Sequence, residues 1–249
     1  MIPIRDINPT KTFPIVTLVL IAVNLAVFAF VQPHDSTDAE DEFLYKNAAI
    51  ACEVVTWEPV SQSEVDSDTC SDVSEPGFFA DKAILASIFF SLFLHGSWLH
   101  VLFNMWFLWI FGNNVEEAYG PKWFLFGYLG VGLLATLGFV AANPDSVIPL
   151  VGASGAVAGV LGAYLVLFPK NKITSLVIVF FVPIPAFIYL GLWFVSQFAD
   201  QSPNVAWEAH VAGFLVGALV TLMFRTVLIR RLALIHRPRA TLGFPTQFR

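Results

Sequence analysis

Charged residues are scarce in this sequence, and their scarcity excludes an ordinary soluble domain. Only 13% of the 249 residues are charged, against roughly 25% in typical soluble domains, whereas 57% are hydrophobic and the mean hydropathy is +0.72. Segments of about ten residues that alternate polar and apolar side chains, the mark of a transmembrane β-barrel, are also missing. Several long apolar runs remain, and helices satisfy their own backbone groups in lipid. The composition therefore predicts an all-α, polytopic membrane protein.

Cysteine is scarce as well, with Cys52 and Cys70 as the only two. Both lie in a polar segment between Asp35 and Asp81 that holds thirteen of the nineteen acidic residues. So acidic a segment is not a nucleic-acid surface, because nucleic acids attract basic side chains. Two cysteines without neighbouring histidines make a weak zinc site. A disulfide, if the segment faces an oxidising compartment, and a pair of free thiols remain as alternatives.

Six apolar runs approach the ~20 residues that a helix needs to cross a bilayer. They are Phe13 to Val31, Trp98 to Val115, Trp123 to Ala142, Ser154 to Phe168, Ile173 to Ser196 and Ala206 to Ile229. The first lacks the small-residue cleavage site of a signal peptide, so we interpret it as a retained helix. Pro183 and Pro185 predict a kink in the fifth run. The shorter stretch from Ala83 to Leu94 is interpreted as an interfacial or re-entrant segment.

Basic and acidic residues alternate along the connections between these runs. One set of connections, together with the end of the last run, carries the basic residues Arg5, Lys11, Lys122, Lys170, Lys172, Arg225, Arg230, Arg231, Arg237 and Arg239. Because basic loops stay in the cytoplasm, both termini are predicted to be cytoplasmic and the acidic segment external. The predicted organisation is a cytoplasmic N-terminus over 1–12, transmembrane helix 1 over 13–31, an acidic external loop with a membrane-embedded segment over 32–97, transmembrane helices 2–6 over 98–229 and a basic cytoplasmic tail over 230–249.

Four polar residues share one depth in this arrangement. At 1.5 Å per residue, Ser154 and His210 lie about 21 and 22 Å from the cytoplasmic ends of their helices, and Asn104 and His100 about 18 and 24 Å. An ionisable residue at membrane depth is by default a functional-site hypothesis. Ser154 opens a short helix whose unpaired N–H groups can bind an oxyanion. The depths suggest a nucleophile, Ser154, and its base, His210, as a dyad, since no acidic residue shares their depth.

Other residues near this depth have two interpretations. His100 and Asn104 stand on one helix face, where their donors either stabilise an oxyanion or bond a neighbouring helix. His95 is expected to have a structural role at the membrane interface. Small residues at intervals of four allow helices to approach closely, which would bring the serine to the histidine. These helix-packing residues are Gly155 and Gly159 in one helix, and Gly213 and Gly217 in the other.

Together these stretches resemble the rhomboid family of intramembrane serine proteases. The matching segments are His95 to Asn104 (HGSWLHVLFN), Gly152 to Gly155 (GASG) and Ala209 to Gly213 (AHVAG), within residues 85–225. The resemblance implies a six-helix fold with Ser154 as nucleophile and His210 as general base. It also implies an oxyanion site made of His100, Asn104 and the Ser154 backbone N–H. The sequence departs from many members at 85–88, which reads LASI instead of containing Trp-Arg, and from some at Ala158, where they carry an aromatic residue.

The sequence therefore predicts a serine endopeptidase that hydrolyses peptide bonds in or near transmembrane segments of single-span membrane proteins, through an acyl-enzyme. No metal and no organic cofactor is predicted. The alternative is a catalytically inactive rhomboid-like protein that binds transmembrane clients, followed by a small transporter with a polar site near the midplane. In the absence of an organelle-targeting pattern, we expect a multi-pass protein of a prokaryotic plasma membrane.

Overall fold

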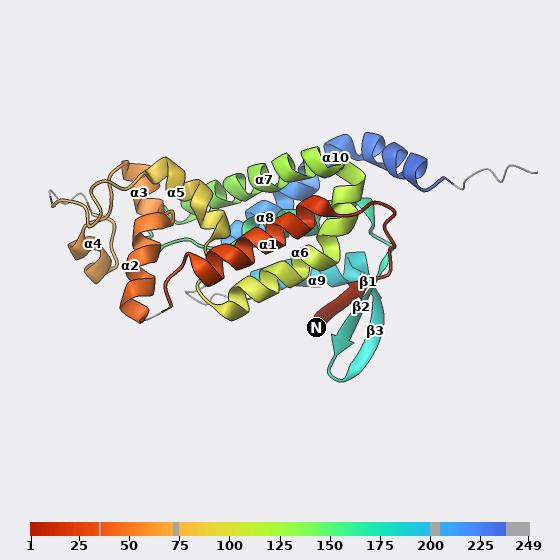
Figure 1. Ribbon diagram of the computed structural model, residues 1–249, viewed down its shortest axis with the longest axis horizontal. Coiled ribbons are helices and arrows are strands. Elements are labelled where there is room, and N and C mark those ends of the chain that lie inside the picture. The colour runs from red at the N-terminus through yellow and green to blue at the C-terminus, as the bar shows by residue number, and fades with distance from the viewer. Residues whose placement is uncertain (35, 72–74, 200–204, 238–249) are drawn as a thin grey trace, which may run out of the picture.

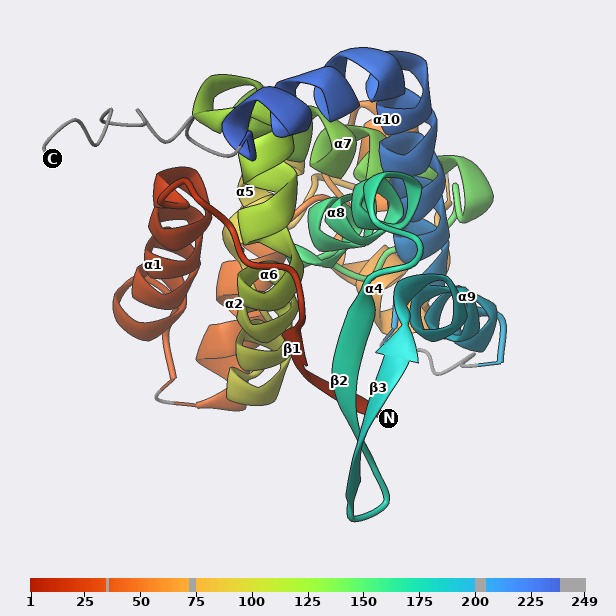
Figure 2. The ribbon, with the colours of Figure 1, turned by 90° about the vertical axis from the view of Figure 1, so that its right-hand side faces the viewer.

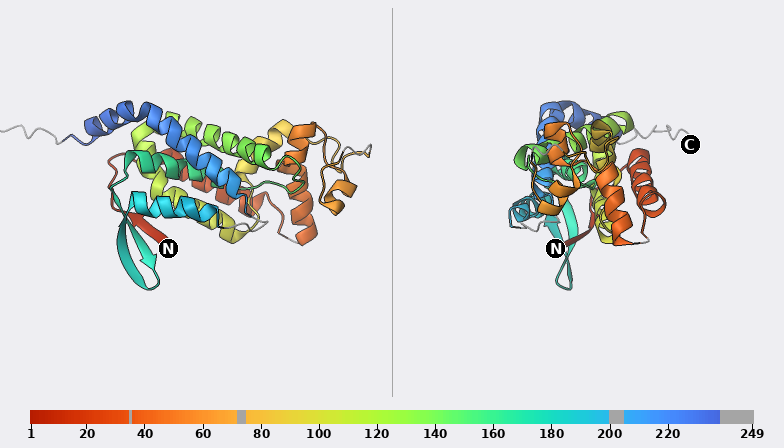
Figure 3. Two further views of the ribbon diagram at one scale, coloured as in Figure 1. Left: turned by 180° about the vertical axis from the view of Figure 1, so that it is seen from behind. Right: turned by 90° about the vertical axis from the view of Figure 1, so that its left-hand side faces the viewer.

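Helices make up most of the computed structural model, which describes residues 1–34, 36–71, 75–199 and 205–237. The bundle is built from α1 (Ile15–Phe30), α6 (Trp98–Tyr119), α7 (Pro121–Ala142), α8 (Ser154–Leu167), α9 (Ala186–Gln197) and α10 (Trp207–Ile235). Figures 1 and 3 show these helices running along the long axis of the molecule. Helix α8 is buried along nearly its whole length, so the other helices are arranged around it.

Length and hydropathy divide the apolar helices into three groups. Helices α7 and α10 are each long and apolar enough to cross a bilayer. Helix α6 passes this test together with α5 (Ile84–Phe90) and the 3-10 turn η1 (Ser91–Phe93), from which it is bent by 74°. Helices α1, α8 and α9 have only 16, 14 and 12 residues, below the ~20 of a straight crossing. The six-span count therefore stays a prediction, although five of the six runs form helices near the expected bounds.

The fifth predicted span is wrong over its first half, where the chain forms a β-hairpin. Strands β2 (Lys172–Val177) and β3 (Phe180–Pro185) pair antiparallel, and β1 (Ile2–Asp6) pairs antiparallel with the other edge of β2. β-Branched residues favour strands, and prolines 183 and 185 donate no helical hydrogen bond. Helix α9 begins only at Ala186. The all-α prediction is thus corrected to a helical fold with a small sheet, whose strand β1 lies within residues 1–12.

The N-terminal segment is hydrogen-bonded to the end of the bundle where α6 meets α7. The Glu116 carboxylate accepts the N–H groups of Val16 and Thr17 at 3.0 and 2.8 Å, which caps the first turn of α1. Two positions earlier on α6, the Asn114 side chain donates to the carboxylate of Asp6 in β1. We call this end of the bundle, which also carries Lys122, Lys170 and Lys172, the basic end.

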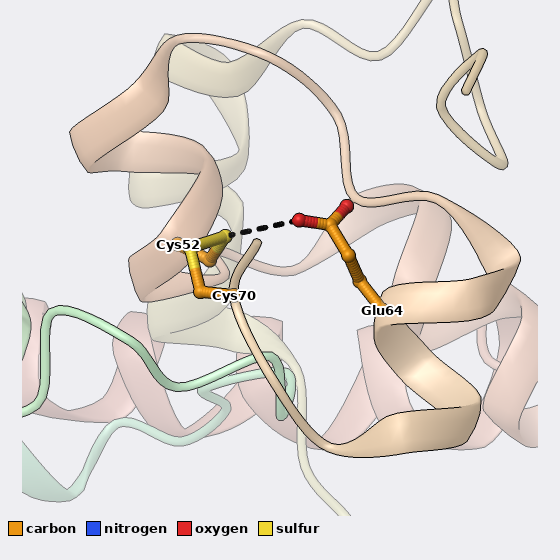
Figure 4. Close-up of side chains that lie close together, drawn as sticks. All are labelled: Cys52, Glu64 and Cys70. Atoms are coloured by element: carbon orange, nitrogen blue, oxygen red, sulfur yellow. Dashed lines mark hydrogen bonds between the residues drawn. A yellow bond between two sulfur atoms is a disulfide. The ribbon is translucent and has the colours of Figure 1, made fainter. Parts of the chain in front are cut away.

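Residues 36–71 and 75–82 form a small helical unit at the opposite end, which we call the acidic cap (Figure 1). It contains α2 (Thr37–Asn47), α3 (Ala51–Thr56) and α4 (Gln62–Ser67). A disulfide joins Cys52 of α3 to Cys70 after α4, which decides between the two alternatives that the sequence left open. Figure 4 shows Glu64 beside it, with Oε1 4.0 Å from Cys52 Sγ. Because disulfide sulfurs carry no proton and are not thiolates, this is a contact rather than a hydrogen bond or a metal site.

A buried ion pair joins α3 to the C-terminal end of the acidic cap. Lys82 Nζ lies 2.6 Å from Glu53 Oε2 of α3, and both side chains are only 1% exposed. Burial raises the pKa of Glu53 despite the neighbouring ammonium group, and burial lowers the pKa of Lys82. Each charge is costly to bury alone, so the pair stabilises the cap only while both partners are present.

Removing one member of this pair tests its contribution. We expect Lys82→Met to destabilise the cap by about 3 kcal/mol, because the Glu53 carboxyl is left buried without its cation. The double variant Glu53→Met/Lys82→Met is expected to recover most of that loss, since no charge is then stranded. Thermal unfolding and limited proteolysis of the detergent-solubilised protein measure both effects. The matched control is Lys46→Met at an exposed lysine; a Lys82→Met protein as stable as this control would contradict the expectation.

Candidate active site

A cavity of about 1100 Å³ lies between helices α6, α8, α9 and α10, toward the acidic cap. His100 and Asn104 of α6, Ser154 of α8 and His210 of α10 all line it. The four polar residues that the sequence placed at one depth are therefore brought to one cavity by three helices. Helix α9 adds Gln197 to the same lining.

Ser154 is the first residue of α8, and the loop before it fits closely against α6. Gly152 has a φ of 125°, a conformation that glycine adopts readily and other residues rarely do. A Cβ atom on Gly152 would stand 2.9 Å from His100 Nε2 and 3.4 Å from Ser154 Oγ. Residue 152 must therefore lack a side chain for the imidazole and the hydroxyl to approach the same stretch of backbone. The N–H groups of the first turn of α8 have no acceptor within that helix.

His210 lies near the start of α10 and is held by α9. Its Nδ1 atom lies 2.7 Å from Oε1 of Gln197, and its ring lies 6.3 Å from that of Trp193. An amide oxygen only accepts hydrogen bonds, so Nδ1 carries a proton in this contact. When the ring is neutral, Nε2 is then the nitrogen that can accept one. Gln197 was not predicted from the sequence. The available signal was its spacing of four from Trp193 in an apolar helix, which puts both on one face.

Asn104 presents a buried donor to the cavity. The residue is 6% exposed, and its Nδ2 atom has no hydrogen-bond partner among the described residues. Leaving a buried amide donor unpaired is unfavourable, so such atoms call for an explanation. Because Asn104 and His100 line the same cavity, an oxygen atom carrying negative charge there would supply the missing acceptor.

His95 supports this arrangement from outside the cavity. It is 1% exposed, and its ring meets the His100 ring edge-on at 5.1 Å. Its Nε2 atom accepts the N–H of Ala153, directly before the serine, at 3.5 Å. The Gln32 side chain bonds both the N–H and the carbonyl of His95, at 2.9 and 2.8 Å. His95 is therefore buried and contacts both His100 and the loop before Ser154, and its position at a membrane interface stays a prediction.

Helices α8 and α10 touch backbone to backbone. A Cβ atom on Gly213 would stand only 2.0 Å from the carbonyl oxygen of Gly155, and one on Gly217 would stand 2.2 Å from that of Gly159. Such distances exclude any side chain at these two positions of α10 without moving the helices apart. Since Gly155 directly follows Ser154, the contact sets the serine beside the turn of α10 that carries His210.

Fold and cavity together define a helical membrane protein with a serine and a histidine inside its bundle. The Rhomboid domain family matches residues 83–227, more than half of the chain. The chain therefore belongs to the rhomboid family, whose members are embedded in membranes.

Three relatives show how far this likeness extends. The chain is 32% identical over 142 residues to rhomboid protein 1, mitochondrial, of Saccharomyces cerevisiae, covering 53% of this chain and 40% of that protein. It is 30% identical over 134 residues to the putative rhomboid protease YdcA of Bacillus subtilis, covering 53% and 63%. It is 32% identical over 135 residues to the rhomboid protease GluP of the same species, covering 52% and 25%. The chain thus spans less than two thirds of each relative.

The glycine contact between α8 and α10 yields a test of packing. We expect Gly213→Ala to lower the free energy of unfolding by about 1–3 kcal/mol, because the added methyl group overlaps the Gly155 carbonyl and forces the helices apart. The control is Gly130→Ala in α7, where an added Cβ meets nothing within 4 Å. Thermal unfolding in detergent compares the two variants. Equal midpoints for Gly213→Ala and Gly130→Ala would refute the close contact.

Proposed function

We propose that this rhomboid family member is an intramembrane serine endopeptidase that cleaves membrane proteins in or near their transmembrane segments. The observation that carries the proposal is the convergence of Ser154, His210, His100 and Asn104 on one cavity. A further support is that the relatives GluP and YdcA are described as a rhomboid protease and a putative one. The cavity is large enough for water as well as for part of a peptide chain.

In the proposed reaction, the Ser154 hydroxyl attacks the scissile carbonyl carbon while His210 Nε2 takes its proton. The negative charge that develops on the carbonyl oxygen is stabilised by Asn104 Nδ2, by His100 and by the Ser154 N–H. The amine then leaves with the proton from His210, and an acyl-enzyme remains. Water hydrolyses this ester with His210 again as base. Gln197 is a positioning residue, since it holds Nδ1–H and so leaves Nε2 to act on the serine.

The proposed membrane topology keeps six crossings, with both termini cytoplasmic and the acidic cap external. Helices α1, α8 and α9 would complete their crossings with adjoining loops. The disulfide supports an external cap, because disulfides persist in oxidising compartments. The basic tail over 230–249 begins within α10, and residues 238–249 lie outside the described residues, as do 200–204 before α10.

The proposed substrates are single-span membrane proteins, which reach the cavity through the bilayer. Relatives of this chain include mitochondrial proteins of yeast and Arabidopsis thaliana as well as proteins of Bacillus subtilis. Placement in a prokaryotic plasma membrane therefore stays a prediction.

Covalent labelling tests the dyad directly. We expect a fluorophosphonate probe to label the detergent-purified wild type, and Ser154→Ala and His210→Ala to abolish both labelling and cleavage of a reporter transmembrane substrate, because nucleophile and base are both required. Circular dichroism and thermal unfolding establish that each variant is folded. A folded wild type that neither labels nor cleaves would instead favour the inactive, client-binding alternative.

The kinetic constants of an Asn104→Ala variant test this residue as an oxyanion donor. We expect Asn104→Ala to lower kcat about 100- to 1000-fold with a much smaller change in KM, because the hydrogen bond forms mainly in the transition state. Steady-state cleavage of the same reporter measures both constants. The control is Asn47→Ala, whose side chain bonds the Phe43 carbonyl within the acidic cap. A loss confined to KM would assign Asn104 to substrate binding.

A further inference from the structure

The β2–β3 hairpin exposes an unusually apolar tip. Residues 177–182 read Val-Ile-Val-Phe-Phe-Val, and four of them are among the most exposed hydrophobic residues described: Ile178 at 88%, Val179 at 71%, Phe180 at 69% and Phe181 at 66%. In Figure 1 the hairpin points away from the helices at the basic end, and in Figure 2 its tip stands clear of every helix. Exposed apolar surface of this kind marks a contact with a partner or a membrane.

The residues of the turn at the tip are ones that rarely occur in such a turn. Ile178 has a φ of 57°, in the left-handed region that a β-branched residue rarely occupies. Two-residue hairpin turns in water favour Asn and Gly, which adopt positive φ at little cost and are polar. Ile178 and Val179 satisfy neither preference. Apolar side chains at this position are therefore favoured by the surroundings of the tip, not by its backbone.

The base of the hairpin has the opposite chemistry. Lys172 is the first residue of β2, and Lys170 lies two residues before it. Arg5 of the neighbouring strand β1 pairs with Thr174 of β2. All three cations are exposed. No charged residue follows in the sequence until Asp200. Cations at one end of an element and apolar side chains at the other are typical of segments held at a bilayer surface, where phosphates bind the cations and acyl chains surround the apolar part.

The helix that follows the hairpin also exposes large apolar side chains. Helix α9 follows β3 directly and exposes Phe187 at 53% and Leu192 at 52%. The hairpin is held in place rather than hanging free, because β1 pairs with β2 and the Asp6 carboxylate of β1 accepts hydrogen bonds from Asn114 of α6 and from Tyr164 of α8, the latter at 3.0 Å. Its orientation relative to the bundle, and so to the membrane, is thereby fixed.

We propose that the β2–β3 hairpin is a membrane-insertion element. Its tip, Ile178 to Val182, lies among the acyl chains of the leaflet at the basic end of the bundle. Its base binds the anionic phosphates of the same leaflet through Arg5, Lys170 and Lys172. In the topology proposed above this is the cytoplasmic leaflet. The inference requires only that the bundle is embedded in a bilayer, and does not depend on protease activity.

The depth of the tip can be measured with a nitroxide attached to Val179→Cys. The native cysteines form a disulfide and do not react with the label under non-reducing conditions. In vesicles of phosphatidylcholine and phosphatidylglycerol, oxygen collides with labels among acyl chains and a nickel chelate with labels in water. We expect residue 179 to match the lipid-facing control Leu219→Cys of α10 and to have a several-fold higher ratio of oxygen to nickel accessibility than Asp66→Cys of the acidic cap.

Two results would overturn the proposal. A nickel accessibility at residue 179 equal to that at residue 66 would place the tip in water. Low accessibility to both reagents, with dipolar broadening between labels, would mean that a second copy of the chain covers the tip.

A second variant separates insertion from folding. Replacing the turn by Ile178→Asn/Val179→Gly relieves the left-handed isoleucine and makes the tip polar, so the hairpin is expected to stay folded but to rise toward water. With the label at Phe180→Cys, nickel accessibility should increase several-fold over the same label beside the native turn.

Omitting phosphatidylglycerol should also reduce the depth at residue 179, and Lys170→Gln/Lys172→Gln should remove this lipid dependence. An unchanged depth in both comparisons would contradict the insertion.

Discussion

The close backbone contact between α8 and α10 is the constraint on which the site depends. In lipid, the hydrophobic effect does not drive helices together, so they associate through van der Waals contact and hydrogen bonds. Gly213 and Gly217 bring α10 onto the carbonyl groups of Gly155 and Gly159 because neither glycine has a side chain. The position of Ser154, which precedes Gly155, therefore depends on the absence of side chains at Gly213 and Gly217. A single methyl group at Gly213 would act on the site without touching any reactive atom.

The loop before Ser154 shows how irregular backbone obtains hydrogen-bond partners inside the protein. Its groups need partners because lipid supplies none. The Gly152 N–H donates to the Ser91 carbonyl at 2.9 Å, and the Leu150 N–H donates to the Ala49 carbonyl at 2.8 Å. Ala49 lies in the acidic cap, two residues before α3 begins. The acidic cap is stabilised by its disulfide and its ion pair. It thus supports the loop that precedes Ser154.

The sequence predicted best the features that depend on helical spacing and depth. The bounds of α8, the shared cavity of Ser154 and His210, and the glycines between α8 and α10 follow from counting along helices. The hairpin did not, because hydropathy does not distinguish an apolar strand from an apolar helix, and Pro183 was interpreted as a kink. Strand β1 could not be predicted from the sequence, for a different reason. Its partner lies about 170 residues away in the sequence, and no local pattern specifies such a pairing.

Strand β1 also joins two helices that share no direct connection in the chain. The carbonyl of Pro3 accepts the indole N–H of Trp106 on α6 at 2.7 Å, and the carbonyl of Met1 lies 3.5 Å from the hydroxyl of Tyr189 on α9. The same strand pairs with β2. The N-terminal segment therefore connects α6 to α9 at the basic end. These contacts resist movement of the first turn of α9 away from α6. Any separation of the two helices would therefore be widest at the other end of α9, beside Gln197.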